Sequence, residues 1–357
     1  MILERDGFTV LDAAVPAQRA QWLAAWQTWS RRDVVAHPGY AELFAGPGDQ
    51  TICACQNRAD GGILFPLIVR SLKGESWVED AEGISDLTSP YGYGGPFGWG
   101  TYSAEEFWQG FDAWTHSVRA VALFTRFSLF KEELIPFHGD VVVKGPCVIV
   151  PVKGDGQSLL RSYEKTAREN VRQAERAGVS VEIDLECRRL DEFLSVYHST
   201  MKRLDALPMY FFARPFFERL LAGLPRQAML VHGIYQQQVV SSEMLLQSED
   251  HVYSFLGGTL EAGLPVRANP LLRHAVNVWA AMNGKQFVVL GGGYAGKDSL
   301  LRYKQRFAPT SAVEFAVGTR ILDPARYQSL VEQRIAWERR TTPGWLPDPG
   351  FFPAYRS

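Results

Sequence analysis

Two stretches of this 357-residue chain, 51–137 and 228–307, predict the same order of secondary-structure elements. Each predicts a hairpin, a further strand, a Gly-rich turn, a helix, a strand and a final helix. The hairpin strands are predicted at 51–57, 62–69, 228–235 and 238–246. The matched order predicts two copies of one α/β unit, each a mixed sheet with helices packed on its faces. One large α/β domain with decorations is the alternative.

The length of the chain also favours two units, since 357 residues exceed a single typical core. We expect a first unit at 1–150, a second at 151–320, and a C-terminal helix with a Pro-rich tail at 321–357. The clearest helix is predicted at 158–177, where apolar residues recur three or four apart and Gly178 follows the last turn.

Charge and motif content exclude several classes of protein. The net charge of −2 argues against general coating of nucleic acid. The four cysteines form no CxxC pair, and the histidines form no HExxH motif, so no metal site is expected. No GxSxG elbow is present, which disfavours a hydrolase with a covalent nucleophile. The N-terminus lacks a signal-peptide pattern and no apolar run is long enough to span a bilayer, which predicts a cytoplasmic protein without a membrane span.

A cationic stripe runs along the predicted helix 158–177. Its members are spaced four, three, four and four residues apart and share one helical face: Arg161, Lys165, Arg168, Arg172 and Arg176. Such a stripe can hold phosphates of a nucleotide-linked substrate or of tRNA. Three glutamates on the same helix favour a solvated face for most members. Arg168, in the middle, is the predicted substrate-binding residue.

Two Gly-rich turns mark candidate ligand sites. In the segment 89–96 glycines permit positive φ and prolines fix the turn, and Tyr91 and Tyr93 are expected to line a cleft. The turn 291–293 follows a strand and precedes a helix, so its amides can face an oxyanion. It has neither P-loop nor dinucleotide-binding spacing.

Two further places combine cations with aromatic residues. Lys304 lies beside Tyr303 in a positive segment at the end of the second unit, where a lysine can stabilise the charge of a tetrahedral intermediate. Arg203 and Tyr210 flank a break at Pro208, and loops after helices often line clefts. From the residues alone, a surface lysine and a structural loop are the favoured interpretations.

Three segments of the second half resemble, in order and spacing, motifs of the FemABX family, which is related to the GNAT acyltransferases. The first, 163–174, resembles a pattern in which a Lys, an Arg and a further basic residue precede Ala and Gly. The other two resemble a strand–turn–helix start and a closing motif: 253–259 with Asn269, Leu271 and Leu272, then 290–293 with Tyr303, Lys304 and Phe307. Residues 90–96 are similar to a segment of many GNAT-type proteins.

This resemblance implies two tandem GNAT-like domains, of mixed α/β architecture, with an active-site cleft between them. It implies that Lys304 stabilises an oxyanion and that Arg203 binds a phosphate or carboxylate. The full set of predicted substrate-binding residues is Arg168, Arg203, Tyr210, Tyr91, Tyr93, Asn269, Tyr303 and Gly292.

The resemblance also implies an activity, because FemABX members usually move an amino acid from aminoacyl-tRNA to an amine, often on a peptidoglycan precursor. GNAT enzymes hold the CoA pyrophosphate with a Gly-rich turn, but here the segment 263–270 contains Pro265 and Pro270, which lack amide donors. We therefore expect aminoacyl-tRNA as the donor, a small-molecule or peptide amine as the acceptor, and no bound cofactor. A CoA-dependent N-acyltransferase and a non-catalytic ligand-binding protein are the alternatives.

Overall fold

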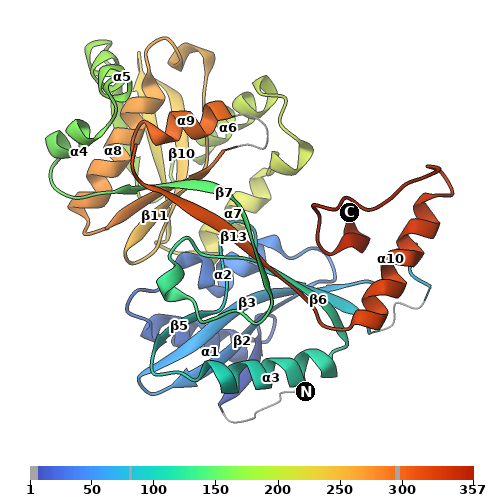
Figure 1. Ribbon diagram of the computed structural model, residues 1–357. Helices are drawn as coiled ribbons and strands as arrows, with labels where there is room; N and C mark the ends of the chain where they lie inside the picture. The colour runs from blue at the N-terminus through green and yellow to red at the C-terminus, as the bar shows by residue number, and fades with distance from the viewer. Residues whose placement is uncertain (1–6, 80–82, 294–297) are drawn as a thin grey trace. The chain divides into compact units, whose positions relative to one another are not determined.

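The computed structural model describes residues 7–79, 83–293 and 298–357, and Figure 1 shows the course of the chain. These residues group into two compact units. Unit 1 contains the residues up to Ser30, together with Val35–Lys144 and Phe315–Ser357. Unit 2 contains Arg31–Val34 and Gly145–Glu314. The domain boundaries expected at 150 and 320 stay predictions, and the C-terminal segment groups with unit 1.

Unit 1 is a mixed sheet in the order β1-β2-β3-β4-β6-β13, with β5 paired to β3. Its strands are β1 (Phe8–Asp12), β2 (Gln50–Arg58), β3 (Gly61–Ser71), β4 (Ser85–Thr88), β5 (Phe97–Gly100), β6 (Ala120–Arg126) and most of β13 (Ala312–Ile321). Its helices are α1 (Pro16–Thr28), α2 (Pro38–Ala41), α3 (Ala104–Ser117) and α10 (Pro324–Glu338). β2 and β3 form the hairpin expected from the sequence.

Unit 2 is a mixed sheet in the order β8-β9-β10-β11-β12-β7. Its strands are most of β7 (Asp140–Pro151), β8 (Ser180–Asp184), β9 (Ala228–Tyr235), β10 (Gln238–Gln247), β11 (His251–Thr259) and β12 (Phe287–Gly292). Its helices are α4 (Gly156–Ser162), α5 (Lys165–Arg176), α6 (Leu190–Arg203), α7 (Arg214–Gly223), α8 (Ala268–Met282) and α9 (Asp298–Gln305).

The two sheets repeat one arrangement. In each, three antiparallel pairings lead to a single parallel pair, β4–β6 in unit 1 and β11–β12 in unit 2. One helix, α3 or α8, connects the strands of that parallel pair, as a crossover requires. The repeat confirms the prediction of two copies of one α/β unit. The sequence did not predict the position of β7 in the sheet of unit 2. This strand comes first in the chain but lies at the far side of the sheet, next to β12.

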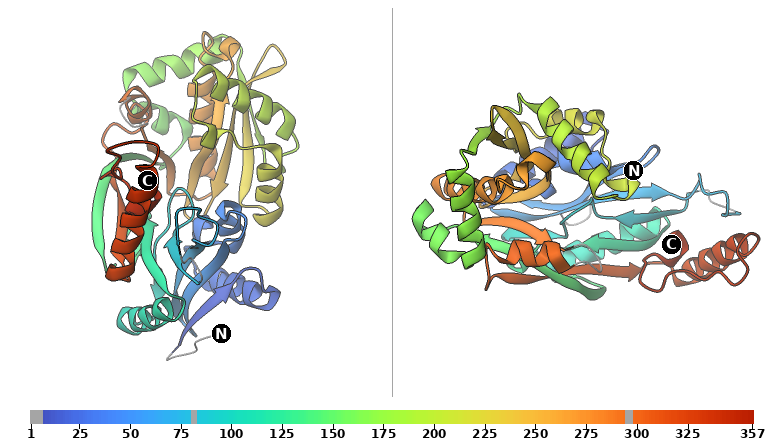
Figure 2. Two further views of the ribbon diagram at one scale, coloured as in Figure 1. Left: turned by 90° about the vertical axis from the view of Figure 1, so that its right-hand side faces the viewer. Right: turned by 90° about the horizontal axis from the view of Figure 1, so that it is seen from above.

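Each core lies between the sheet and its crossover helix. In unit 2, Ala268, Leu272, Val276 and Ala280 recur every four residues along α8 and are fully buried in the core cluster with sheet residues such as Val252. Helix α6 packs on β10 and β11 from the other face of the sheet (Figures 1 and 2). Burial of each larger apolar side chain, such as Leu272 or Val276, contributes roughly 1.5–3 kcal/mol and helps to hold the strand ends in fixed positions.

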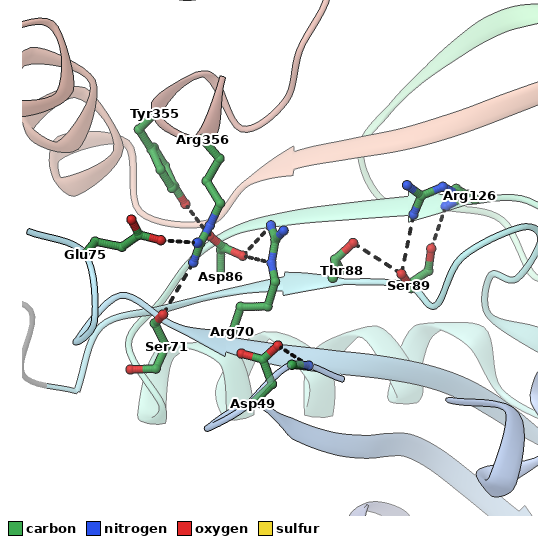
Figure 3. Close-up of polar contacts among 11 residues, drawn as sticks. Asp49, Arg70, Ser71, Glu75, Asp86, Thr88, Ser89, Arg126, Tyr355 and Arg356 are labelled. Carbon is green, nitrogen blue, oxygen red and sulfur yellow. Dashed lines mark hydrogen bonds and ion pairs between the residues drawn. The ribbon is translucent and has the colours of Figure 1, made fainter. Parts of the chain in front are cut away.

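The C-terminal segment of unit 1 is anchored by a buried carboxylate. Asp86 on β4 accepts hydrogen bonds from Arg70 Nε and from Arg356 Nε, each at 2.6 Å (Figure 3). Arg356 also pairs with Glu75 at 2.7 Å, and Tyr355 is fully buried beside them. The tail after α10 is therefore part of the fold of unit 1.

The structure corrects several predicted elements. The helix expected at 158–177 is two helices, α4 and α5, because the chain turns at Tyr163, whose φ and ψ are extended. The further strand predicted after the first hairpin, near 76–78, is a turn, while β1, β4 and β5 were not predicted. These three strands have only four or five residues, too few for a clear alternation of apolar and polar positions.

Candidate active site in unit 2

The two parallel strands of unit 2, β11 and β12, are hydrogen-bonded to each other over only part of their length. β11 and β12 pair at three positions, from His251 opposite Phe287 to Tyr253 opposite Val289. Beyond that point β11 pairs with β10, and β12 pairs with β7 after a register shift between Val289 and Gly291. In α/β folds, ligands bind outside the carboxyl ends of such parallel strands. The ends of β11 and β12 are therefore the first place to look for a site.

Lys304 lies at the carboxyl end of β12. It belongs to the last turn of α9, and its Nζ donates to the carbonyl oxygen of Gly292 at 2.6 Å. Burial lowers the pKa of Lys304 to about 8, with a further contribution from the nearby cation of Arg273. The ammonium group is therefore fixed in place, partly desolvated and still charged at neutral pH.

A buried ion pair lies next to this lysine. Glu243 on β10 and Arg273 on α8 are only 4% and 7% exposed, and each contact between the guanidinium and the carboxylate is 3.0 Å. Glu243 also accepts a hydrogen bond from the hydroxyl of Ser254 on β11. These groups form a buried polar cluster, which is unfavourable unless every charge has a partner.

Tyr303 and Asn269 extend the cluster. The Tyr303 hydroxyl donates to Oδ1 of Asn269, at the start of α8. Burial raises the pKa of Tyr303 to about 12, although the positive charge of Arg273 acts in the opposite direction. The tyrosine is therefore a neutral hydrogen-bond donor at physiological pH. The structure thus brings together four residues singled out in the sequence: Asn269, Gly292, Tyr303 and Lys304.

The end of β11 carries its own cation. Arg203, at the C-terminus of α6, donates from Nη2 to the carbonyl oxygen of Thr259 at 2.9 Å. The backbone carbonyl of Tyr210 accepts a hydrogen bond from the hydroxyl of Tyr197 on α6. Arg203 and Lys304 thus lie at the ends of the two strands whose pairing stops early.

Arg168 is engaged in a different way. Its Nη1 donates to the carbonyl oxygens of Tyr163 and, at 3.4 Å, of Arg161. These carbonyls lie where α4 ends, so the side chain stabilises the junction between α4 and α5. The other cations of the stripe, Arg161, Lys165, Arg172 and Arg176, are exposed. The role of Arg168 in substrate binding stays a prediction.

Comparison with known proteins identifies the fold around this cluster. Residues 161–305 match the acetyltransferase (GNAT) domain family. These residues therefore form a GNAT-type acyltransferase domain. This match covers the Lys304 cluster and most of unit 2. No curated protein matches the sequence.

Solved structures resemble the chain in fold over both units. FemX has 14% sequence identity and a TM-score of 0.64, with 87% of this chain and 98% of FemX covered. A second structure is named as the C-terminal domain of a lysylphosphatidylglycerol synthetase from Agrobacterium fabrum. It has 11% identity and a TM-score of 0.52, with 89% of this chain and 96% of that domain covered. A conserved protein of unknown function from Bacteroides thetaiotaomicron has 9% identity and a TM-score of 0.55, with 85% of this chain and 96% of that protein covered. The FemABX-like fold expected from the sequence is confirmed.

The segment before α8 shows how this GNAT unit departs from a pyrophosphate-binding turn. The amides of Gly263, Leu264 and Arg267 donate to carbonyl oxygens within the segment itself. Pro265 has no amide hydrogen, and Ala268 at the start of α8 is fully buried. Arg267 adopts φ 58°, a left-handed conformation that non-glycine residues seldom take. Three amides of this segment are therefore already bonded and two of its positions have no amide hydrogen, while the choice of donor stays a prediction.

Tyr91 and Tyr93 lie in unit 1, outside the residues that match the GNAT domain. The hydroxyl of Tyr40 donates to the carbonyl oxygen of Tyr91 at 2.7 Å, and the ring of Tyr93 packs edge-on against Phe315. Both tyrosines are partly exposed. Their part in substrate binding stays a prediction.

The sequence analysis missed Glu243 and Arg273. One signal was available: Glu243 is a single carboxylate within a strand whose residues 239–246 are otherwise apolar or small. A charge in such a strand needs a buried partner. That partner is 30 residues away in sequence, so spacing alone does not identify it.

Two absences complete the description of the structure. Within 7–79, 83–293 and 298–357, no three His, Cys, Asp or Glu side chains are grouped so that they could hold a metal ion. In the same part of the chain, no helix has the length and apolar character needed to cross a membrane.

Proposed function

We propose that the chain is an N-acyltransferase that forms an amide bond between an aminoacyl group and the amine of a small molecule or peptide. The proposed donor is aminoacyl-tRNA, and the proposed acceptor is a peptidoglycan precursor or a natural-product intermediate. The observation that carries the proposal is the position of Lys304, which is held at the end of β12 by its hydrogen bond to Gly292.

Lys304 suits the charge that develops during acyl transfer. The acceptor amine attacks the ester carbonyl carbon; a C–N bond forms, the ester C–O bond breaks, and the ribose oxygen leaves with the proton that the amine loses. In between, the carbonyl oxygen carries negative charge, and a preorganised cation lowers the barrier to that state. One of the three ammonium hydrogens binds Gly292, which leaves two for the oxyanion. With a pKa of about 8, about nine-tenths of Lys304 is charged at pH 7.

The surrounding groups support this role. Glu243 is bound by Arg273 and Ser254, so it acts as a fixed counter-charge to Arg273. Removing the charge of Glu243 would leave Arg273 uncompensated and make Lys304 harder to protonate. Arg203, at the end of β11, is placed to bind an anionic group of the donor or the acceptor.

The choice of donor rests on two observations. In the segment before α8, the amides of Gly263, Leu264 and Arg267 are already bonded and Pro265 has none, which disfavours binding of the CoA diphosphate. One structural relative is named for lysylphosphatidylglycerol, an aminoacylated lipid, and another is FemX. Both support aminoacyl transfer.

The test is transfer of radiolabelled amino acids from a pool of charged tRNA to amines, with and without RNase, beside a panel of acyl-CoA donors. We expect transfer that RNase abolishes. RNase-resistant transfer from an acyl-CoA would show that the segment before α8 still holds the diphosphate, and would replace the donor in this proposal. No transfer from either donor to any amine would favour a ligand-binding protein.

A further inference from the structure

We infer that unit 1 contains a binding site for a small anion, a carboxylate or a phosphate group, held by Arg126 and by the backbone of the Gly-rich segment 89–96. This site shares no residue with the Lys304 cluster. It does not depend on the proposed transfer reaction.

The position of Arg126 in the fold gives the first argument. Arg126 is the last residue of β6, the second strand of the parallel pair in unit 1. Gly292 is the last residue of β12, the corresponding strand of unit 2, and Lys304 binds its carbonyl oxygen. Each unit therefore carries a cation where its parallel pair ends, which is where α/β folds bind their ligands.

The contacts of the Arg126 side chain give the second argument. The guanidinium lies over the ring of Phe124, 4.9 Å from its centroid, and makes one long hydrogen bond of 3.5 Å, to the carbonyl oxygen of Ser89. Among the described residues, no carboxylate lies within 4.0 Å of it. Arg70 and Arg356 in the same unit differ, since each pairs with Asp86 (Figure 3).

A partly buried cation without a carboxylate partner is unfavourable unless an anion binds it. Burial lowers the pKa of Arg126 from its ordinary value, while Tyr91 and Tyr40 act in the opposite direction. Arg126 stays charged at any physiological pH, so this cost is always present.

The backbone of the Gly-rich segment gives the third argument. Gly92 and Gly95 adopt φ 88° and 115°, which favour glycine. Within the part of the chain that the structure describes, the amides of Gly92, Gly94 and Gly95 donate no hydrogen bond, although Gly94 and Gly95 are buried. Buried amides need an acceptor, and neighbouring free amides in a turn make a concavity suited to an anion.

The amides and the guanidinium belong to one place. The backbone amide of Arg126 donates to Oγ of Ser89 at 2.9 Å, which joins the end of β6 to the start of the Gly-rich segment. A Cβ built on Gly94 would lie 3.4 Å from the carbonyl oxygen of Arg126. The hydroxyl of Tyr40 holds the carbonyl of Tyr91 at 2.7 Å, so the turn is fixed before any ligand binds.

The test is a titration of the full chain, labelled with ¹⁵N-glycine, with inorganic phosphate and separately with acetate, at constant ionic strength set by chloride. We expect saturable shifts of the Gly92, Gly94 and Gly95 amide signals with at least one probe. The probe that binds identifies the class of anion. Arg126→Gln should weaken binding at least tenfold, and Arg126→Lys should weaken it less. Arg58→Gln is the matched control, because Arg58 lies in unit 1 and pairs with Glu106.

Two outcomes would overturn the inference: no saturable shift of these glycines with either probe, or unchanged binding in Arg126→Gln. If Arg126→Gln does not fold, the wild-type titration and Arg126→Lys decide the question. Lys304→Met should leave the anion titration of the glycine amides unchanged, because Lys304 is not part of this site. The titration therefore tests the anion site alone, and the transfer assay tests the proposed reaction alone.

Discussion

The carboxylate of Asp86 gives a stability prediction that can be worked from the structure. Its side chain is fully buried, and Arg70 and Arg356 each bind it at 2.6 Å (Figure 3). Asp86→Asn keeps the size and shape of the side chain but removes its charge. Arg70 and Arg356 would then face a neutral amide. Arg356 would keep Glu75, whose side chain is 34% exposed, and a long hydrogen bond to the carbonyl oxygen of Ser71.

The expected loss follows from the burial of each partner. Removing one member of a buried ion pair costs about 3–5 kcal/mol, because the other charge is left without compensation. The side chains of Arg70 and Arg356 are 28% and 15% exposed, so water partly compensates them. We therefore expect a loss at the lower end, about 3 kcal/mol. For a unit of this size, that lowers the melting temperature by roughly 6–12 °C.

Urea unfolding followed by tryptophan fluorescence measures this loss. Nine of the ten tryptophans lie in unit 1 and only Trp279 lies in unit 2, so the signal reports mainly on unit 1. Asp49→Asn is the control, because Asp49 accepts a single hydrogen bond from the Gly46 amide in an exposed loop. That change should cost less than about 1 kcal/mol. If Asp86→Asn costs no more than Asp49→Asn, the reasoning about the buried carboxylate is refuted.

Three further predictions concern unit 2. Because Lys304 must be charged to stabilise an oxyanion and its pKa is about 8, the rate of transfer should fall as the pH rises through about 8; a rise there would indicate a base instead. Glu243→Gln should lower the free energy of unfolding by roughly 3 kcal/mol in urea denaturation, because Arg273 loses its partner, and should move the fall in transfer rate to lower pH. Gly258→Ala would place a Cβ 2.2 Å from Oγ1 of Thr200 on α6, so calorimetry should show a free energy of unfolding lower by about 1–3 kcal/mol. An unchanged free energy of unfolding would mean that α6 can shift away from β11 without cost.

Periodicity and turn chemistry predicted most elements of the chain, because buried faces repeat at helix or strand spacing. The same reasoning joined α4 and α5, since the apolar spacing continues through Tyr163 where the backbone does not. The spacing of the cations in the stripe did not predict that the Arg168 guanidinium donates a hydrogen bond to the carbonyl oxygen of Tyr163. That contact depends on the break between the two helices.

The candidate site was partly predictable. The resemblance to FemABX motifs pointed to Lys304 and Tyr303, which the structure places in one polar cluster. The pairing of Glu243 with Arg273 depends on how β10 and α8 pack, and the anchoring of Arg356 on Asp86 joins residues 270 apart. Contacts of this kind come from tertiary packing, so no local pattern in the sequence reveals them.

The central claim is that the ammonium group of Lys304 stabilises the oxyanion of acyl transfer. The most direct test compares single-turnover transfer by Lys304→Met and Lys285→Met, using the donor that the RNase experiment identifies. Lys285 is a matched control, because it is also half-buried in unit 2, has a lowered pKa, and donates to backbone carbonyl oxygens. We expect Lys304→Met to slow transfer by about 10²–10³-fold and Lys285→Met to stay near the wild-type rate. Near-normal transfer by a folded Lys304→Met would contradict the account.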